Sequence, residues 1–215
     1  MPPSPPSRLA ARKQPRQARS RVTIDAIFEA TIQVLLAEGL PRLTTTRVAE
    51  RAGVSVGTMY QYFPHKQALV YALNERYLLA LAERVEAACR AQHGAPVRRM
   101  VEALVTTYWE AKSERPEVTR VLYQSVAELD NRALIEAFGR RVDAASAAML
   151  SSAADAAFDD LESVSLTLLS TVFGTVRNVF ERELPPIQAN RVMGQLVLMC
   201  LAYLDALKLR PAAAG

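Results

Sequence analysis

Apolar residues recur at steps of three and four along most of the chain, a pattern typical of helices. The first such stripe runs from Ile24 to Leu35 and predicts a helix over residues 23–38, which Gly39 and Pro41 end. Further helices are predicted at 66–92, 96–115, 117–129, 132–157, 160–184 and 187–209. No segment alternates apolar and polar residues as a half-buried strand does. The predicted fold class is therefore all-α.

Two much shorter helices are predicted between residues 44 and 63. Thr44 can cap the first, Gly53 ends it, and Ser55 can cap the second. The residues expected to face inward are Val48, Ala49, Ala52, Met59, Tyr62 and Phe63. Two short helices joined by a three- to four-residue turn with glycine form a helix-turn-helix motif.

Charge is distributed unevenly along the chain. Residues 1–76 carry eleven Lys/Arg and five Asp/Glu, a net charge of +6, and six of the basic residues precede the first acid, Asp25. A one-sided basic N-terminus is typical of a module that binds a polyanion. Residues 1–20 are rich in Pro, Ser, Arg and Gln, and we expect a disordered basic arm there. A merely solubilising arm would explain its charge as well.

Composition excludes several other classes of protein. Half of the 215 residues are hydrophobic, enough for a core, but no apolar run approaches the roughly 18 residues of a membrane span, so we expect no membrane association. Cys89 and Cys200 have no Cys or His at metal-ligand spacing, which predicts no metal and a reducing cytoplasm. No cofactor motif or catalytic residue is found; Gly53-Val-Ser-Val-Gly57 resembles a nucleophile elbow but does not follow a strand. We therefore expect no enzyme.

The second short helix carries the candidate base-reading residues. Its exposed face would present Ser55, Val56, Gly57, Thr58 and Gln61 to a DNA groove, with methyl, hydroxyl and amide groups. Thr45, Thr46, Tyr60 and Lys66 are placed to reach phosphates through hydroxyls, helix N-terminal amides and charge. An ordinary solvated surface is the alternative for Thr45, Tyr60 and Lys66, and packing against the turn is the alternative for Val56.

The stretch LTTTRVAERAGVSVGTMYQYFPHKQAL resembles the DNA-binding region of TetR-type (tetracycline-repressor-like) transcriptional regulators. The matching positions are Ala49, Ala52, Gly53, Val54, Ser55, Gly57, Tyr60, Tyr62, Phe63, Lys66 and Leu69. The resemblance covers about residues 21–70 and implies a DNA-binding domain at 21–66, followed by a ligand-binding and dimerisation domain at 67–215. His65 departs from the family pattern, where Ser, Asn or Asp more often caps the next helix, and imidazole is a poorer cap.

Residues 96–180 contain the candidate ligand contacts. Aromatic and polar residues that could line an apolar cavity are Tyr108, Trp109, Tyr123, Gln124, Phe138 and Phe173. Aromatic residues at helical spacing are more often simply core. If they do bind a ligand, the apolar surroundings favour a small hydrophobic effector.

The last two predicted helices are apolar on more than one face, and a surface helix needs only one apolar stripe. Leu169 and Leu201 are among the residues expected at a second interface. The resemblance implies that these helices form a four-helix bundle in a homodimer. A fully buried helix in a monomer is the alternative.

These observations predict a transcriptional regulator, by family default a repressor, that binds a palindromic double-stranded DNA operator as a homodimer. The recognition helices of a dimer must lie about 34–36 Å apart to enter successive major grooves. A small hydrophobic effector would release the protein from DNA by changing that spacing. The alternative is a helical adaptor or small-molecule-binding protein without specific DNA binding.

Overall fold

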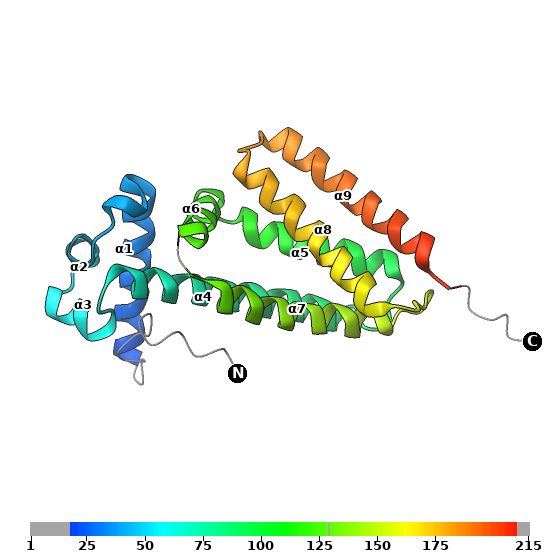
Figure 1. Cartoon of the computed structure of the whole chain (residues 1–215), viewed down its shortest axis with the longest axis horizontal. Helices are drawn as coiled ribbons and strands as arrows, with labels where there is room; N and C mark the ends of the chain where they lie inside the picture. The colour runs from blue at the N-terminus through cyan, green and yellow to red at the C-terminus, as the bar shows by residue number, and fades with distance from the viewer. Residues whose placement is uncertain (1–17, 129, 210–215) are drawn as a thin grey trace, which may run out of the picture. The chain divides into compact units, whose positions relative to one another are not determined.

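The computed structural model describes residues 18–128 and 130–209, and within them it contains nine helices. They are α1 (Ala18–Arg42), α2 (Thr45–Ala52), α3 (Val56–Tyr62), α4 (Lys66–Ala91), α5 (Val97–Ser113), α6 (Pro116–Glu128), α7 (Arg132–Ser151), α8 (Leu161–Glu181) and α9 (Pro186–Leu207) (Figure 1). In this part of the chain, extended pairing is limited to one bridge between Ala157 and Leu209. The all-α prediction is confirmed.

Helix α1 begins earlier than predicted. It starts at Ala18 rather than Thr23, so the last three residues of the expected disordered arm are helical instead. Nothing in the sequence interrupts a helix there, and Ala and Arg both favour one. The rest of the arm, residues 1–17, lies outside the described residues. The predicted stop is confirmed, because Gly39 has a φ of 75° and breaks the helical geometry.

The chain packs as two compact units. The described residues up to Leu78, together with Glu117–Ala137, form unit 1, whereas Leu79–Pro116 and the described residues from Phe138 onward form unit 2. The sequence predicted a single boundary at residue 66, with everything after it in the second domain. In the structure the later segment Glu117–Ala137 belongs to the same unit as the helix-turn-helix. Helix α4 is continuous from unit 1 into unit 2.

Unit 1 has its own apolar core. Ile27, Val34 and Leu35 from α1 pack with Val48 and Met59 from the two short helices, all nearly inaccessible to solvent. Helix α6 closes this core with Val118 and Leu122. It is also fixed by hydrogen bonds, since Tyr77 and Thr119 share one of 2.9 Å and the Ser125 hydroxyl donates to Asn74 Oδ1 at 3.2 Å.

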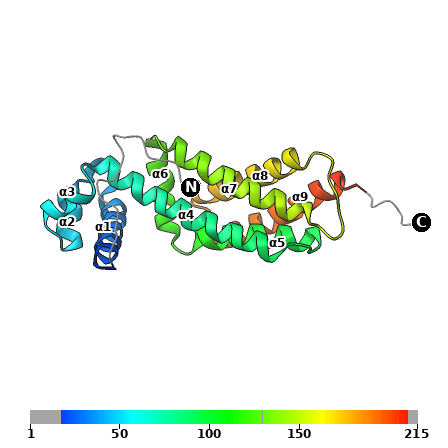
Figure 2. The same ribbon diagram turned by 90° about the horizontal axis from the view of Figure 1, so that it is seen from below.

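Unit 2 is built on long helices. Helices α8 and α9 form an antiparallel hairpin and lie side by side (Figure 1), and α9 also packs on α5 (Figure 2). Helices α4 and α7 are joined by Arg141 and Glu86, which make two hydrogen bonds of 2.6 and 2.8 Å. This contact lowers the pKa of the Glu86 carboxyl.

The helix predicted at 132–157 is too long by about six residues, because α7 ends at Ser151. Beyond it, polar groups bind the turn between α4 and α5. Ser152 Oγ accepts from the Gly94 N–H at 3.0 Å, and Asp155 Oδ1 accepts from the Val97 N–H at 2.8 Å. Asp155 thus caps α5, a bond between residues far apart in sequence that competes with continuing α7.

Candidate functional site

Two hydroxyl caps fix the helix-turn-helix. Thr44 Oγ1 accepts from the Arg47 N–H at 3.2 Å, and Ser55 Oγ accepts from the Thr58 N–H at 3.0 Å. Gly53 ends α2 in the left-handed conformation, with φ 67° and ψ 28°, which glycine adopts without a steric penalty. The predicted capping and turn are therefore confirmed.

Helix α3 has one buried side and one exposed side. Met59 is 0% exposed and Tyr62 6%, whereas Val56 is 38% exposed and Tyr60 42%. Gly57 and Gln61 are also exposed. The core placement predicted for Met59 and Tyr62 is confirmed, and the helix presents a continuous outer face that a groove could receive.

The internal packing of unit 1 does not require a glycine at position 57. A Cβ built on Gly57 meets Ser55 Oγ at 3.7 Å, an ordinary van der Waals distance. Its φ is not among the positive values of the described residues. Any requirement for glycine at this exposed position must therefore come from something that approaches α3 from outside.

The residues expected to contact phosphates are not equally accessible. Thr46 and Tyr60 are exposed, whereas the Thr45 side chain is buried at 7% exposure. Since Thr45 is the first residue of α2, it can offer its backbone N–H, which has no partner within the helix, rather than its hydroxyl. Lys66 Nζ donates to the Leu40 carbonyl at 3.3 Å, so Lys66 also ties the start of α4 to the end of α1.

His65 caps α4 even though its side chain departs from the family pattern. Its Nδ1 accepts from the Ala68 N–H at 3.2 Å. An accepting Nδ1 carries no proton, so the proton of the neutral ring lies on Nε2. Imidazole therefore satisfies one of the free amides at this helix start.

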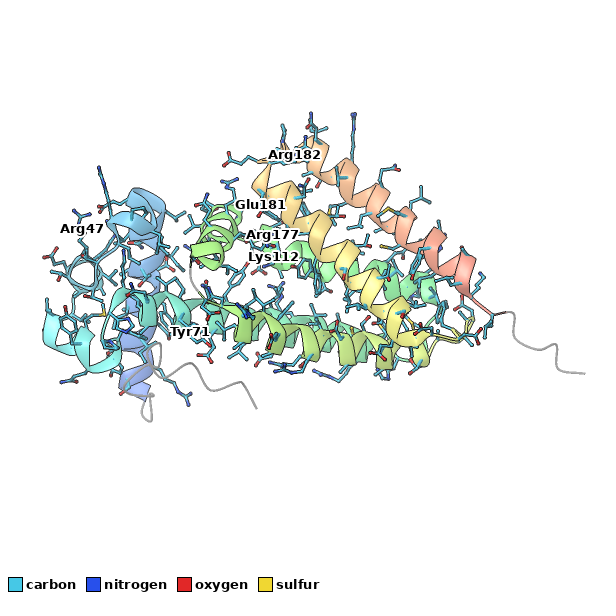
Figure 3. All side chains as sticks on the ribbon, viewed as in Figure 1. Arg47, Tyr71, Lys112, Arg177, Glu181 and Arg182 are labelled. Atoms are coloured by element: carbon cyan, nitrogen blue, oxygen red, sulfur yellow. The ribbon has the colours of Figure 1, made fainter. Side chains whose placement is uncertain are left out.

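Sequence reasoning did not single out two arginines on α2. Arg47 forms an ion pair with Glu38 and donates to the Arg42 carbonyl, and Arg51 Nε donates to Gln33 Oε1 at 2.8 Å (Figure 3 labels Arg47). The sequence feature that could have identified them is the excess of basic residues in this region. Their partners, all on α1, orient both guanidinium groups.

Aromatic rings gather in unit 2. Tyr108 from α5 stacks on Phe173 from α8 with centroids 4.3 Å apart, and Phe138 from α7 lies 5.6 Å from Phe173. Trp109 lies 5.6 Å from Phe180. Four of the six predicted ligand residues are therefore in one unit, and three of them form a single group, which we call the ring cluster (Tyr108, Phe138 and Phe173).

The other two predicted ligand residues lie on α6 in unit 1. Tyr123 is half-buried, and Gln124 is exposed. They were predicted to share a site with the other four because they are close to them in sequence. Unit 2, however, ends at Pro116 and resumes only at Phe138, so the segment between them belongs to unit 1.

A buried lysine beside the ring cluster was missed. Lys112 is 2% exposed, and its Nζ lies 5.6 Å from the centroid of the Tyr108 ring. Burial, and to a lesser extent the charge of Arg177, lowers the pKa of Lys112 to about 7. The signal was its position, since Val101, Leu104, Tyr108 and Lys112 continue one stripe of α5.

Two family models match this chain. The model described as bacterial regulatory proteins, tetR family, matches residues 27–73, and the model described as tetracyclin repressor-like, C-terminal domain, matches residues 96–204. The chain belongs to the TetR family. It is therefore a DNA-binding regulator rather than an enzyme, and both the fold and the family predicted from the sequence are confirmed.

The TetR-family relatives include nucleoid occlusion factors. SlmA from Glaesserella parasuis is 35% identical over 97 residues, which cover 45% of this chain and 47% of that protein. SlmA from Haemophilus ducreyi is 34% identical over 109 residues, covering 50% and 53%. The chain spans about half the length of these curated relatives.

Solved structures of TetR-family proteins share the fold. A regulator from Streptomyces coelicolor has a TM-score of 0.58 at 24% identity, covering 86% of this chain and 99% of that one. SmeT, described as the repressor of the Stenotrophomonas maltophilia multidrug efflux pump SmeDEF, has a TM-score of 0.67 at 20% identity, covering 87% and 93%.

No helix in the described ranges is long and apolar enough to span a bilayer.

Proposed function

We propose that this TetR-family protein is a repressor that binds a roughly palindromic DNA operator as a homodimer and leaves it when a small hydrophobic effector binds. The observation that carries the proposal is the exposed face of α3, held in place by capped helix ends and a buried opposite side. Acting on DNA, such a regulator would work in the cytoplasm.

In this proposal α3 lies in the major groove. Val56, Gly57, Thr58 and Gln61 would meet base edges, with Ser55 at the start of the helix. Because α3 carries no Arg, Asn or Asp, part of the specificity would come from DNA shape.

The sugar–phosphate backbone would be contacted from both ends of the motif. The first amides of α2, at Thr45 and Thr46, point out of a helix N-terminus and favour an anion. The Tyr60 hydroxyl and the Lys66 ammonium would add contacts of their own. Lys66 then has two roles, because it also binds the Leu40 carbonyl.

The proposed dimer interface is the outer face of the α8–α9 hairpin. Large apolar side chains stand exposed there: Leu166 is 55% exposed, Leu198 60% and Met199 50%. Between them α8 offers small residues such as Ser170 and Gly174, which allow helices to approach closely. A second copy of the chain would cover this apolar face and form the four-helix bundle.

The effector would bind at the ring cluster and Trp109 in unit 2. SmeT, which shares the fold at a TM-score of 0.67 and 23% identity, has been solved as a complex with triclosan. Helix α4 starts four residues after α3 ends and continues into unit 2, so a shift there can displace α3. Such coupling usually amounts to about 1–3 kcal/mol, and operator must weaken effector binding by the same factor.

The test is DNA binding by the full chain. Duplexes selected from a random pool would be labelled, and affinity measured by fluorescence anisotropy from about 50 to 200 mM salt. Tyr60→Ala should weaken binding to every duplex, and Lys66→Ala, which removes a positive charge, should in addition make the salt dependence shallower. Ile135→Ala, at a position 48% exposed on α7, is the matched control and should leave binding unchanged.

A selection that yields no preferred sequence, with Tyr60→Ala binding as well as the unaltered protein, would contradict the operator proposal. The protein would then be better described as a helical adaptor or small-molecule-binding protein.

A further inference from the structure

The first turn of α2 carries an arginine whose guanidinium is held through one nitrogen only. Arg47 Nη1 forms the ion pair with Glu38 and donates to the Arg42 carbonyl at 3.2 Å, and these two acceptors use its two N–H groups. The N–H groups of Arg47 Nε and Nη2 find no acceptor among the described residues. These two nitrogens form one edge of the guanidinium plane, and such an edge can bind two oxygens of one phosphate.

The guanidinium of Arg47 lies at the N-terminal end of α2 (Figure 3 labels Arg47). Both of its acceptors come before the Thr44 cap in the chain, so the side chain reaches back over the start of the helix rather than along it. Because the side chain is 47% exposed, a partner from outside can approach it. Thr45 and Thr46, whose amides are proposed above to meet a phosphate, belong to the same turn.

A second cation is anchored beside the first. Lys66 Nζ donates to the Leu40 carbonyl at 3.3 Å, two residues before the carbonyl that Arg47 uses. Residues two apart in a chain lie within about 7 Å of each other, so the two cations lie over the same short stretch of backbone. Of the acids in the described ranges, Glu38 alone forms an ion pair with either of them. One positive charge is left in excess, and it attracts an anion.

The ion pair with Glu38 does not by itself require an arginine. A lysine ammonium has three donors and could bind both Glu38 and the Arg42 carbonyl. An ion pair this exposed also contributes little to stability, usually about 0–1 kcal/mol. Only the guanidinium adds a planar edge with two further donors, which matches the geometry of a phosphate.

We propose that Arg47 binds one phosphate of the operator through two parallel hydrogen bonds, from Nε and Nη2, while Glu38 and the Arg42 carbonyl hold Nη1. The inference rests on the proposed function, because it adds a residue to the surface of the motif that contacts DNA. Since every nucleotide carries the same phosphate, Arg47 fixes the position of the protein on the duplex and does not read sequence.

The experiment measures binding of the full chain to the selected duplex by fluorescence anisotropy from about 50 to 200 mM salt. A hydrogen bond to a charged group is worth roughly ten- to hundredfold in affinity, so Arg47→Met should weaken binding at least tenfold. It should also lower the slope of log affinity against log salt by about 0.9 for each chain bound. Arg47→Lys keeps the charge and loses the planar edge, so it should keep the slope and lose most of the same affinity.

Two variants serve as controls. Arg51→Lys makes the same exchange one turn later on α2 and should leave the affinity unchanged. Glu38→Ala breaks the ion pair but leaves the guanidinium and its bond to the Arg42 carbonyl, so it should bind DNA at least as tightly as the unaltered protein. A loss in Glu38→Ala equal to that in Arg47→Met would show that Arg47 acts by joining α1 to α2, and would overturn the proposal.

A change in the DNA identifies the phosphate directly. Each phosphate of one half-site is replaced in turn by a neutral methylphosphonate, and the affinity of each duplex is measured with the unaltered protein and with Arg47→Met. At one position the replacement should weaken binding of the unaltered protein and have little effect on the variant, as coupled partners do in a double-mutant cycle. If Arg47→Met fails to fold by circular dichroism, Arg47→Lys takes its place in this comparison.

Three further results would overturn the proposal: Arg47→Met binds as tightly as the unaltered protein, Arg47→Lys does so, or no phosphate is coupled to position 47. An equal loss in Arg51→Lys and Arg47→Lys would also refute it, because the effect would not be specific to the start of α2. Failure of the unaltered protein to bind any preferred duplex would refute the proposed function as well. Tight binding to a preferred duplex with no effect at position 47 would refute this inference alone.

Discussion

Replacing Lys112 by methionine should change how the stability of the protein depends on pH. In the folded chain its pKa is lowered to about 7 from a usual value of 10.5. Between these two pH values the unfolded chain binds about one more proton than the folded chain, so the free energy of unfolding of the unaltered protein rises with pH across this window. Methionine has no proton to lose, and the variant should lack this contribution.

The magnitude follows from the shift. Each pKa unit corresponds to about 1.4 kcal/mol, so a shift from 10.5 to about 7 destabilises the fold by about 5 kcal/mol at pH values below 7. Because Lys112 is 2% exposed, solvent screening reduces this figure little. Between pH 7 and pH 9 about 2 kcal/mol of this penalty should disappear, since half of the folded molecules have already lost the proton at pH 7.

The assay is urea unfolding followed by circular dichroism at pH 6, 7, 8 and 9, at one protein concentration. Subtracting the variant from the unaltered protein cancels every other titrating group that the substitution leaves unchanged. Lys112→Met should be the more stable protein at pH 6, and its advantage should shrink as pH rises. A difference that stays constant from pH 6 to pH 9 would refute the lowered pKa and the reasoning from burial.

Three further predictions concern other parts of the chain. Gly57→Ala should raise the melting temperature slightly, because alanine favours a helix over glycine by up to about 1 kcal/mol and its methyl group has room, yet anisotropy should show weaker DNA binding. Leu198→Arg should give a monomer in light scattering while circular dichroism shows an unchanged helix content; a dimer that persists would exclude this face of α9. Asp155→Ala should cost about 1 kcal/mol of unfolding free energy in urea titration, since it removes the cap on the Val97 N–H, and DNA affinity measured on the folded protein should not change.

Most of the local structure could be predicted because it depends on neighbouring residues. Caps at Thr44 and Ser55 and the left-handed Gly53 follow from short-range rules, and so did the helix-turn-helix. The predictions that failed concern segments whose structure depends on contacts between residues far apart in sequence. The chain leaves helix α7 at Ser151 because residues beyond it bind the turn before α5, a partner 58 positions away.

Periodicity could not tell which apolar stripe of the last helices faces outward. Leu169 and Leu201, expected at a second interface, are 1% and 8% exposed and belong to the core of unit 2. Leu198, three residues before Leu201, is 60% exposed. Leucine has the same hydrophobicity in both places, so only the packing of α9 on α5 and α8 separates them.

The return of residues 117–137 to unit 1 has a consequence for cutting or recombining the gene. Val118 and Leu122 are part of the core that supports the helix-turn-helix, so a fragment ending at Leu78 would expose the surface they cover. If the residues up to Leu78, which we call the DNA-reading head, were exchanged between two regulators, they would have to pack against the α6 of the other protein. Grafts that carry the α6 segment along with the head should therefore tolerate more sequence divergence than grafts that carry the head alone.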